Sequence, residues 1–204
     1  MIIGILDTET TGIPERHPFA RVVEVGAVVC DWTEAGIVEI ATFETLARPT
    51  GDEHRLPESG GALSFNQLTA DQIDAAPWDW QVGQALEAFL VGHGVAAVGA
   101  FNDTFDFDAL LLGSGRWLAR LLRTTPNLPD LMVCAHDKLG HEPYTKGGRL
   151  VDCVRRLGRP VLEAHNALAD ARMAASLVPL VLDIVEAQEL APPRAPFVAR
   201  TRAG

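Results

Sequence analysis

The chain has 204 residues, of which 48% are hydrophobic, and this is enough material for one domain with a buried core. Its formal net charge is −10, from 27 acidic and 17 basic side chains. This charge argues against a protein that holds nucleic acid on a broad basic surface, although bound metal ions could still reverse the charge locally.

Two features predict a cytoplasmic protein without a membrane partner. The first apolar run is too short for a signal peptide or a membrane span. The three cysteines, Cys30, Cys134 and Cys153, are an odd number without ligand spacing. Buried free thiols in a reducing compartment are therefore expected.

Residues 1–6 form an almost continuous apolar run that predicts a buried strand, and two acids, Asp7 and Glu9, follow it directly. Because side chains alternate along a strand, both carboxylates should lie on the same face. Desolvating unpaired carboxylates is costly, so a divalent cation would compensate them. Oxygen ligands of this kind suit Mg²⁺ or Mn²⁺.

The next segments alternate between strand and helix patterns. Strands are predicted at 22–30 and 37–46, joined by a turn that makes a hairpin. Residues 47–80 form a loop-rich stretch. After it come a helix at 81–91, a short strand at 95–101 and a helix at 103–112. This order predicts the α/β class.

The C-terminal part carries a helix at 150–157 and a longer one at 167–186, whose apolar residues step by three and four. Pro179 lies inside the longer helix and should kink or split it. Residues 191–204 carry prolines and arginines but few core formers, which predicts a disordered tail after a domain spanning 1–190.

Three further polar residues are placed to share a cleft with the acidic pair. Asp106 is expected in the first turn of the helix that follows the short strand, and His165 in the loop before the last helix. Asn166 is a plausible N-cap, and Asp170 lies one turn inside, on the flank of the apolar stripe. Phosphodiester hydrolysis needs such carboxylates to hold metal ions and a base that titrates near neutral pH, usually histidine.

Three segments resemble, in order and spacing, the motifs of the DEDDh 3′→5′ exonucleases, the superfamily of proofreading exonucleases, RNase T and oligoribonuclease. They are Asp7-Thr8-Glu9-Thr10-Thr11-Gly12, Asn102-x-x-Phe105-Asp106 and His165-x-Ala167-Leu168-x-Asp170-Ala171. The compact stretch between the second and third motifs looks closest to the bacterial exonuclease X branch.

The resemblance implies an RNase H-like fold with a mixed central sheet, a leading antiparallel hairpin and flanking helices. It also implies roles for single residues. Two Mg²⁺ or Mn²⁺ ions would be held by Asp7, Glu9, Asp106 and Asp170, with His165 as the general base. The terminal nucleotide would be contacted by Thr8, Thr10, Thr11, Phe65, Leu68 and Asn102.

The function expected from this resemblance is a metal-dependent 3′→5′ exonuclease that releases nucleoside 5′-monophosphates from single-stranded or frayed DNA. Such an enzyme would serve DNA repair or proofreading, with a DNA polymerase as a conceivable partner. Two alternatives stay open. One is an exoribonuclease of the same superfamily, since a contact to the 2′-OH needs only one or two side chains. The other is a non-catalytic subunit that binds a 3′ end or a polymerase.

Several other polar or aromatic groups favour structural roles. Cys134, His136 and His141 match no standard zinc spacing. Trp78 and Trp80 are expected to pack under the loop-rich stretch rather than to stack on a base.

Overall fold

The computed structural model of the chain describes residues 1–13, 20–113, 124–140, 148–162 and 165–181. Across these ranges, none of the helices combines the length and hydropathy of a membrane span. His141, the predicted tail and the continuation of the last helix beyond residue 181 lie outside them.

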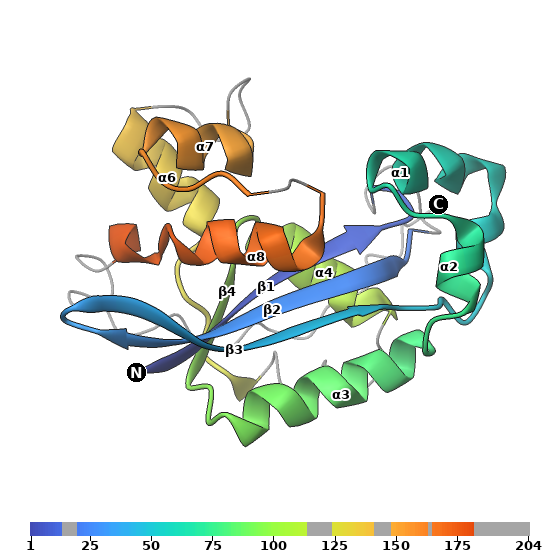
Figure 1. The fold of residues 1–204 in the computed structure, drawn as a ribbon, viewed down its shortest axis with the longest axis horizontal. Helices are drawn as coiled ribbons and strands as arrows, with labels where there is room; N and C mark the ends of the chain where they lie inside the picture. The colour runs from blue at the N-terminus through green and yellow to red at the C-terminus, as the bar shows by residue number, and fades with distance from the viewer. Residues whose placement is uncertain (14–19, 114–123, 141–147, 163–164, 182–204) are drawn as a thin grey trace, which may run out of the picture.

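A four-stranded mixed sheet forms the centre of the molecule (Figure 1). The strands are β1 (Ile2–Thr10), β2 (Val22–Thr33), β3 (Gly36–Leu46) and β4 (Ala97–Ala100), in the order β3-β2-β1-β4. Neighbours β1, β2 and β3 are antiparallel, and β4 is parallel to β1. The predicted mixed sheet with a leading hairpin is therefore confirmed.

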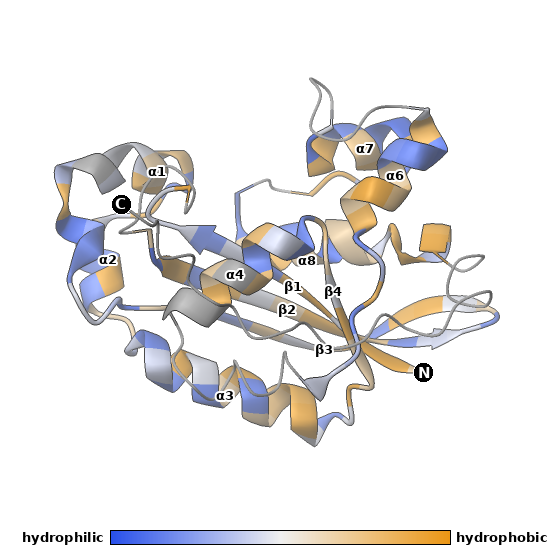
Figure 2. Ribbon diagram, turned by 180° about the vertical axis from the view of Figure 1, so that it is seen from behind, coloured by the Kyte–Doolittle hydropathy of each residue, from blue (hydrophilic) through white to orange (hydrophobic). Residues whose placement is uncertain are grey.

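Helices cover both faces of this sheet. On one face lie α8 (Ala167–Ala175), α6 (Leu131–Leu139) and α7 (Leu150–Arg156), and on the other α3 (Asp79–Gly92) and α4 (Asp103–Gly113) (Figures 1 and 2). Each face has its own apolar core, and the hydrophobic colouring of Figure 2 follows the central strands.

Alternation along β1 divides its side chains between the two cores. Ile3 and Ile5 pack against the core below α8, whereas Leu6 packs on the side of α3 and α4. By the same period of two, Asp7 and Glu9 continue the row of Ile3 and Ile5. The acidic pair is therefore directed toward the α8 face, as the sequence predicts.

The last helix is split at the predicted proline. An α-helix needs a donor at position 179 for the carbonyl of Ala175, but Pro179 has no N–H and its ring would clash there. The α8 helix accordingly ends at Ala175, and a 3₁₀ turn covers Val178–Val181.

Helix α6 was not among the predicted elements. Asp130 caps its start, because the carboxylate accepts the backbone N–H of Val133 at 2.9 Å, and Gly140 in the left-handed conformation caps its end. Its His136 is fully buried, and Nε2 donates to the carbonyl oxygen of Gly148 at 3.0 Å. This histidine therefore packs in the core of the α8 face.

The three cysteines are buried free thiols, as predicted. Burial raises the pKa of Cys30 and of Cys134 to about 11. At neutral pH these side chains therefore behave as small apolar groups.

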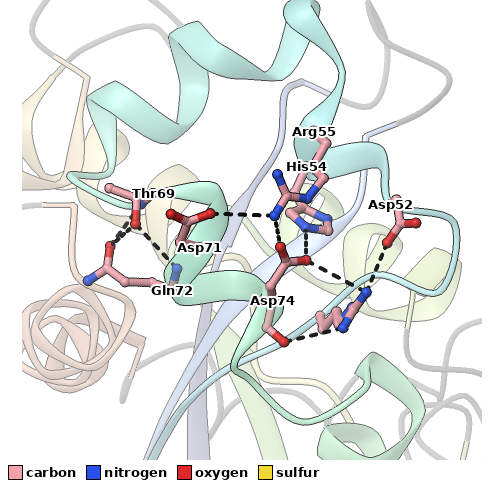
Figure 3. A network of polar contacts seen from close by, with 8 residues as sticks. Asp52, His54, Arg55, Thr69, Asp71, Gln72 and Asp74 are labelled. Carbon is pink, nitrogen blue, oxygen red and sulfur yellow. Dashed lines mark hydrogen bonds and ion pairs between the residues drawn. The ribbon is translucent and has the colours of Figure 1, made fainter.

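The loop-rich stretch contains four short helices that the sequence did not predict: η1 (Glu53–Arg55), η2 (Pro57–Ser59), α1 (Gly60–Phe65) and α2 (Ala70–Asp74). A polar network joins η1 to α2 (Figure 3). Asp74 pairs with Arg55 and with Arg48, and His54 Nε2 donates to its Oδ1 at 2.9 Å. This network thus connects the two elements between which η2 and α1 lie in the sequence.

Trp78 lies below the guanidinium group of Arg48, whose central carbon is 4.4 Å from the ring centroid. Trp78 thus packs within the loop-rich stretch as expected, while Trp80 is 45% exposed.

Candidate active site

The acidic pair of β1 faces two unusual positions of β2. In the register of the two strands, Asp7 lies opposite Gly26 and Glu9 opposite Glu24. Gly26 has no side chain, and the start of α8 approaches it closely. The missing side chain lets the backbone at the start of α8 lie directly on β2, next to the acidic pair.

Asp106 reaches the same place from α4 on the other side of β1. The backbone N–H and the hydroxyl of Thr8 both donate to Asp106 Oδ1, each at 2.9 Å. Asn102 caps this helix, because its side-chain oxygen accepts the N–H of Phe105 at 3.4 Å. Thr8 therefore joins the second acidic segment to the first.

The start of α8 brings in His165 and Asp170. Asn166 caps the helix by accepting the N–H of Ala169 at 2.9 Å. His165 has φ +65°, a left-handed conformation that costs energy for a non-glycine residue, and its N–H donates to Asp170 Oδ2 at 3.2 Å. Strain of this kind is common at functional sites.

One ligand atom each from Glu9, His165 and Asp170 lie within 4.8 Å of one another. Residues from the two ends of the sequence thus meet as the spacing of the motifs predicts.

Reasoning from the sequence missed two residues of this site, Glu24 and Gly26. The Asn166 amide donates to Glu24 Oε1 at 3.1 Å and to Glu44 Oε1 at 2.8 Å, which joins α8 to β2 and β3. An added Cβ at Gly26 would lie 2.2 Å from the carbonyl carbon of Ala167. An acid and a glycine within an otherwise apolar strand were the available signals.

The electrostatics of this site disfavour full ionisation without a cation. Burial, followed by the charge of Asp106, raises the pKa of Asp7 well above its usual value. Burial and the charge of Asp170 raise the pKa of Glu9 to about 8. Burial also raises the pKa of Asp106 to about 7, against the opposing effect of the two Thr8 hydrogen bonds. Burial raises the pKa of Asp170 as well.

This set of residues fits divalent metal ions. Asp170 Oδ1 is buried and has no hydrogen-bond partner among the described residues. Carboxylate oxygens are the ligands that Mg²⁺ and Mn²⁺ prefer, and cations would relieve the mutual repulsion of the cluster. A second group, Asp52, His54 and Asp74, does not fit as well, because two arginines already neutralise Asp74.

The raised pKa values predict an unusual pH dependence of stability in the absence of metal. Between about pH 5 and the raised pKa values, the folded protein binds more protons than the unfolded chain, so the free energy of unfolding falls as pH rises. Glu9, with its pKa of about 8, extends this fall to about pH 8. Thermal unfolding in EDTA across this range measures the slope.

The matched control is Glu9→Gln, for which the fall should be shallower. Burial lowers the pKa of His54, which acts in the opposite sense near pH 6.5, but this effect is common to both proteins and cancels in their difference. Equal slopes for the two proteins would contradict the assignment of the repulsion to the acidic cluster.

A cleft of about 730 Å³ opens beside His165 and Asp170, a volume typical of ligand sites. Phe65 and Asn102 also line it. The rings of Phe65 and His165 are in contact at a tilt of 49°, with centroids 3.9 Å apart, and Phe65 is 61% exposed. Two predicted substrate contacts therefore lie at this cleft together with the predicted base.

The remaining predicted contacts have a different placement. Thr8, Thr10 and Thr11 are buried, and the Thr10 hydroxyl donates to the Gly12 carbonyl at 2.7 Å. Leu68 packs against a small apolar cluster that contains Leu63 and Ile73. Their contact with a nucleotide stays a prediction.

Comparison with solved structures shows the same fold in several nucleases. The nuclease domain of 3′hExo, a DEDDh family member bound to rAMP, matches with a TM-score of 0.69 at 16% identity, over 95% of this chain and 97% of that domain. A full-length 3′-exonuclease matches with a TM-score of 0.66 at 18% identity, over 93% and 62%. Escherichia coli exonuclease I in complex with a dT13 oligonucleotide matches with a TM-score of 0.62 at 18% identity, over 88% of this chain and 40% of the exonuclease I chain.

The chain thus spans less than two thirds of the full-length 3′-exonuclease and less than half of exonuclease I. No curated protein matches it significantly by sequence. The family model of the exonucleases, named after RNase T, matches residues 5–178. This match confirms the expected relationship to the exonucleases, and the DEDDh family member 3′hExo shares the fold. We conclude that the chain belongs to the RNase T exonuclease family and has its RNase H-like fold.

Proposed function

We propose that this chain is a 3′→5′ exonuclease that releases nucleoside 5′-monophosphates from single-stranded or frayed DNA. Two Mg²⁺ or Mn²⁺ ions, held by Asp7, Glu9, Asp106 and Asp170, would be its cofactors. The observation that carries the proposal is the convergence of these carboxylates, from three separate elements, beside a cleft that Asp170 and His165 line.

His165 is the proposed general base. It lies beside Asp170 at the cleft, where the Phe65 ring limits the movement of the imidazole. The hydrogen bond from its N–H to Asp170 Oδ2 holds the backbone of the loop in place. A neutral imidazole there can accept a proton from the attacking water.

The four carboxylates would hold the cations, which when bound would supply charge stabilisation at the phosphate and a more acidic water. Phe65 and Asn102 would hold the terminal nucleotide at the mouth of the cleft. The net charge of −10 disfavours wrapping a long duplex, which supports a single strand end as substrate.

DNA is the proposed substrate, and RNA is the second candidate. Both stay in the test because 3′hExo is bound to rAMP whereas exonuclease I is bound to a DNA oligonucleotide. The test uses 3′- and 5′-labelled DNA and RNA oligomers of one sequence with Mg²⁺, Mn²⁺ or EDTA. We expect metal-dependent shortening from the 3′ end that is faster on DNA. Faster cleavage of RNA would favour the exoribonuclease, and no cleavage with either metal would favour a subunit that only binds.

We also propose that the enzyme works in the cytoplasm, in DNA repair or in proofreading beside a DNA polymerase. A mismatched primer end tests the proofreading role, because frayed ends should be shortened faster than paired ones. Equal rates on the two ends would count against it.

A further inference from the structure

We propose that Arg149, the N-cap residue of α7, and Arg155, inside α7, form a second phosphate-binding site, which takes the backbone of the single strand on the 5′ side of the scissile bond. The inference deepens the proposed function and rests on it. Both arginines line the cleft that His165 and Asp170 also line.

The two arginines are held together by one carboxylate. Arg149 Nε donates to Asp152 Oδ2 at 3.1 Å, and Arg155 Nη1 donates to Asp152 Oδ1 at 3.4 Å. Asp152 is largely covered, with 20% of its side chain exposed, whereas Arg149 and Arg155 are 83% and 62% exposed. The carboxylate thus orients a pair of guanidinium groups that remain open to solvent.

The chemistry of this pair suits a phosphodiester. Each guanidinium group carries five N–H donors, of which Asp152 takes one in the contacts just described. The remaining planar donors match phosphate oxygens better than an ammonium group does. With two positive charges against one negative charge, the group keeps a net positive charge.

The surroundings of the pair connect it to the catalytic residues. Helix α7 packs against α8 beside α6 (Figure 1). The same cleft is also lined by apolar side chains, including Phe105 and Val151. Aromatic side chains can stack on bases without sequence preference. The cleft therefore combines acidic, apolar and basic side chains for one threaded strand.

Charge is the second argument. A chain with a net charge of −10 repels a polyanion. Cations at the carboxylates would neutralise only the phosphate at the reacting end. A substrate longer than two nucleotides needs a further cationic contact, and among the described residues that line the cleft, Arg149 and Arg155 are the two arginines.

The test compares the wild type with the double variant Arg149→Gln/Arg155→Gln, using a dinucleotide and a hexanucleotide of DNA. We expect the KM for the hexanucleotide to rise about tenfold or more, since charge-assisted contacts to phosphate are among the stronger hydrogen bonds. The KM for the dinucleotide and kcat for both substrates should be unchanged. Arg159→Gln is the matched control, because Arg159 lies beyond the end of α7 at a different hollow.

A second readout is independent of cleavage. Binding of a labelled single strand in EDTA is measured by fluorescence anisotropy at several salt concentrations. For single strands, each neutralised phosphate contributes about 0.7 to the slope of log affinity against log salt, so loss of this one site in the double variant should lower the slope by about 0.7. An unchanged slope and an unchanged hexanucleotide KM would overturn the inference while leaving the proposed function intact. A wild type that cleaves neither substrate would refute the proposed function, and the salt slope would then still decide on the arginine pair.

Discussion

Replacing Asp7 by asparagine is expected to abolish most activity and to stabilise the metal-free protein. Charge stabilisation by a bound metal is worth several kcal/mol, and each 1.4 kcal/mol or so is a factor of ten, so kcat/KM should fall about a thousandfold or more. In EDTA above about pH 8, the variant should unfold at a higher temperature than the wild type. It lacks one of the buried charges whose repulsion raises the pKa values of the cluster.

Excess Mg²⁺ should reverse this order of stability. A metal at a hundredfold excess over its Kd stabilises the folded wild type by about 2.7 kcal/mol, and the variant should gain much less. Thermal unfolding with EDTA and with Mg²⁺, together with initial rates on a labelled oligomer, measures both effects. Asp137→Asn, at an exposed position of α6, is the control. If Asp7→Asn kept full activity, the proposed metal centre would be wrong.

Replacing Gly26 by alanine is expected to lower activity far more than stability. The new methyl group would meet backbone atoms of Ala167 and Leu168 at 2.2 to 2.3 Å, and backbone cannot move aside as a flexible side chain can. Overpacking of this kind costs about 1–3 kcal/mol. The start of α8 must shift, and His165 and Asp170 move with it. A displacement of about 1 Å at a reacting group can cost a hundredfold in rate.

The control for this variant is Gly92→Ala at the end of α3, where an added Cβ meets nothing within 4 Å. Its activity and melting temperature should match the wild type within a small margin. Circular dichroism establishes whether Gly26→Ala keeps the fold, and initial rates then report on the site. A folded Gly26→Ala protein with normal rates would mean that the sheet, rather than α8, gives way.

The sequence was most informative where one local pattern determined the outcome. The apolar run before Asp7, the hairpin between residues 22 and 46, and the proline at position 179 each depend on neighbouring residues. The three motifs then placed Asp106, His165 and Asp170 at the ends of elements that meet at β1. The mixed sheet and the family followed from these few segments.

The features that the sequence did not predict depend on contacts between segments that lie far apart in the chain. Glu24 acts through Asn166, 142 residues away, and Gly26 matters only because α8 crosses it. Likewise, the short helices between β3 and α3 are held by pairs such as His54 and Asp74, which no local periodicity reveals. Single-residue propensities carry no information on such partners.

The hydrogen bonds that assemble the site also bear on how the protein folds. Thr8 and Asp106 are 98 residues apart, and Glu24 and Asn166 are 142 residues apart. Closing such long loops costs entropy before the contacts form, which slows folding. During synthesis, β1 leaves the ribosome well before α8, so the carboxylates of the two segments can come together only after α8 has been made. If the proposed function holds, the enzyme would become active only once α8 docks on the sheet.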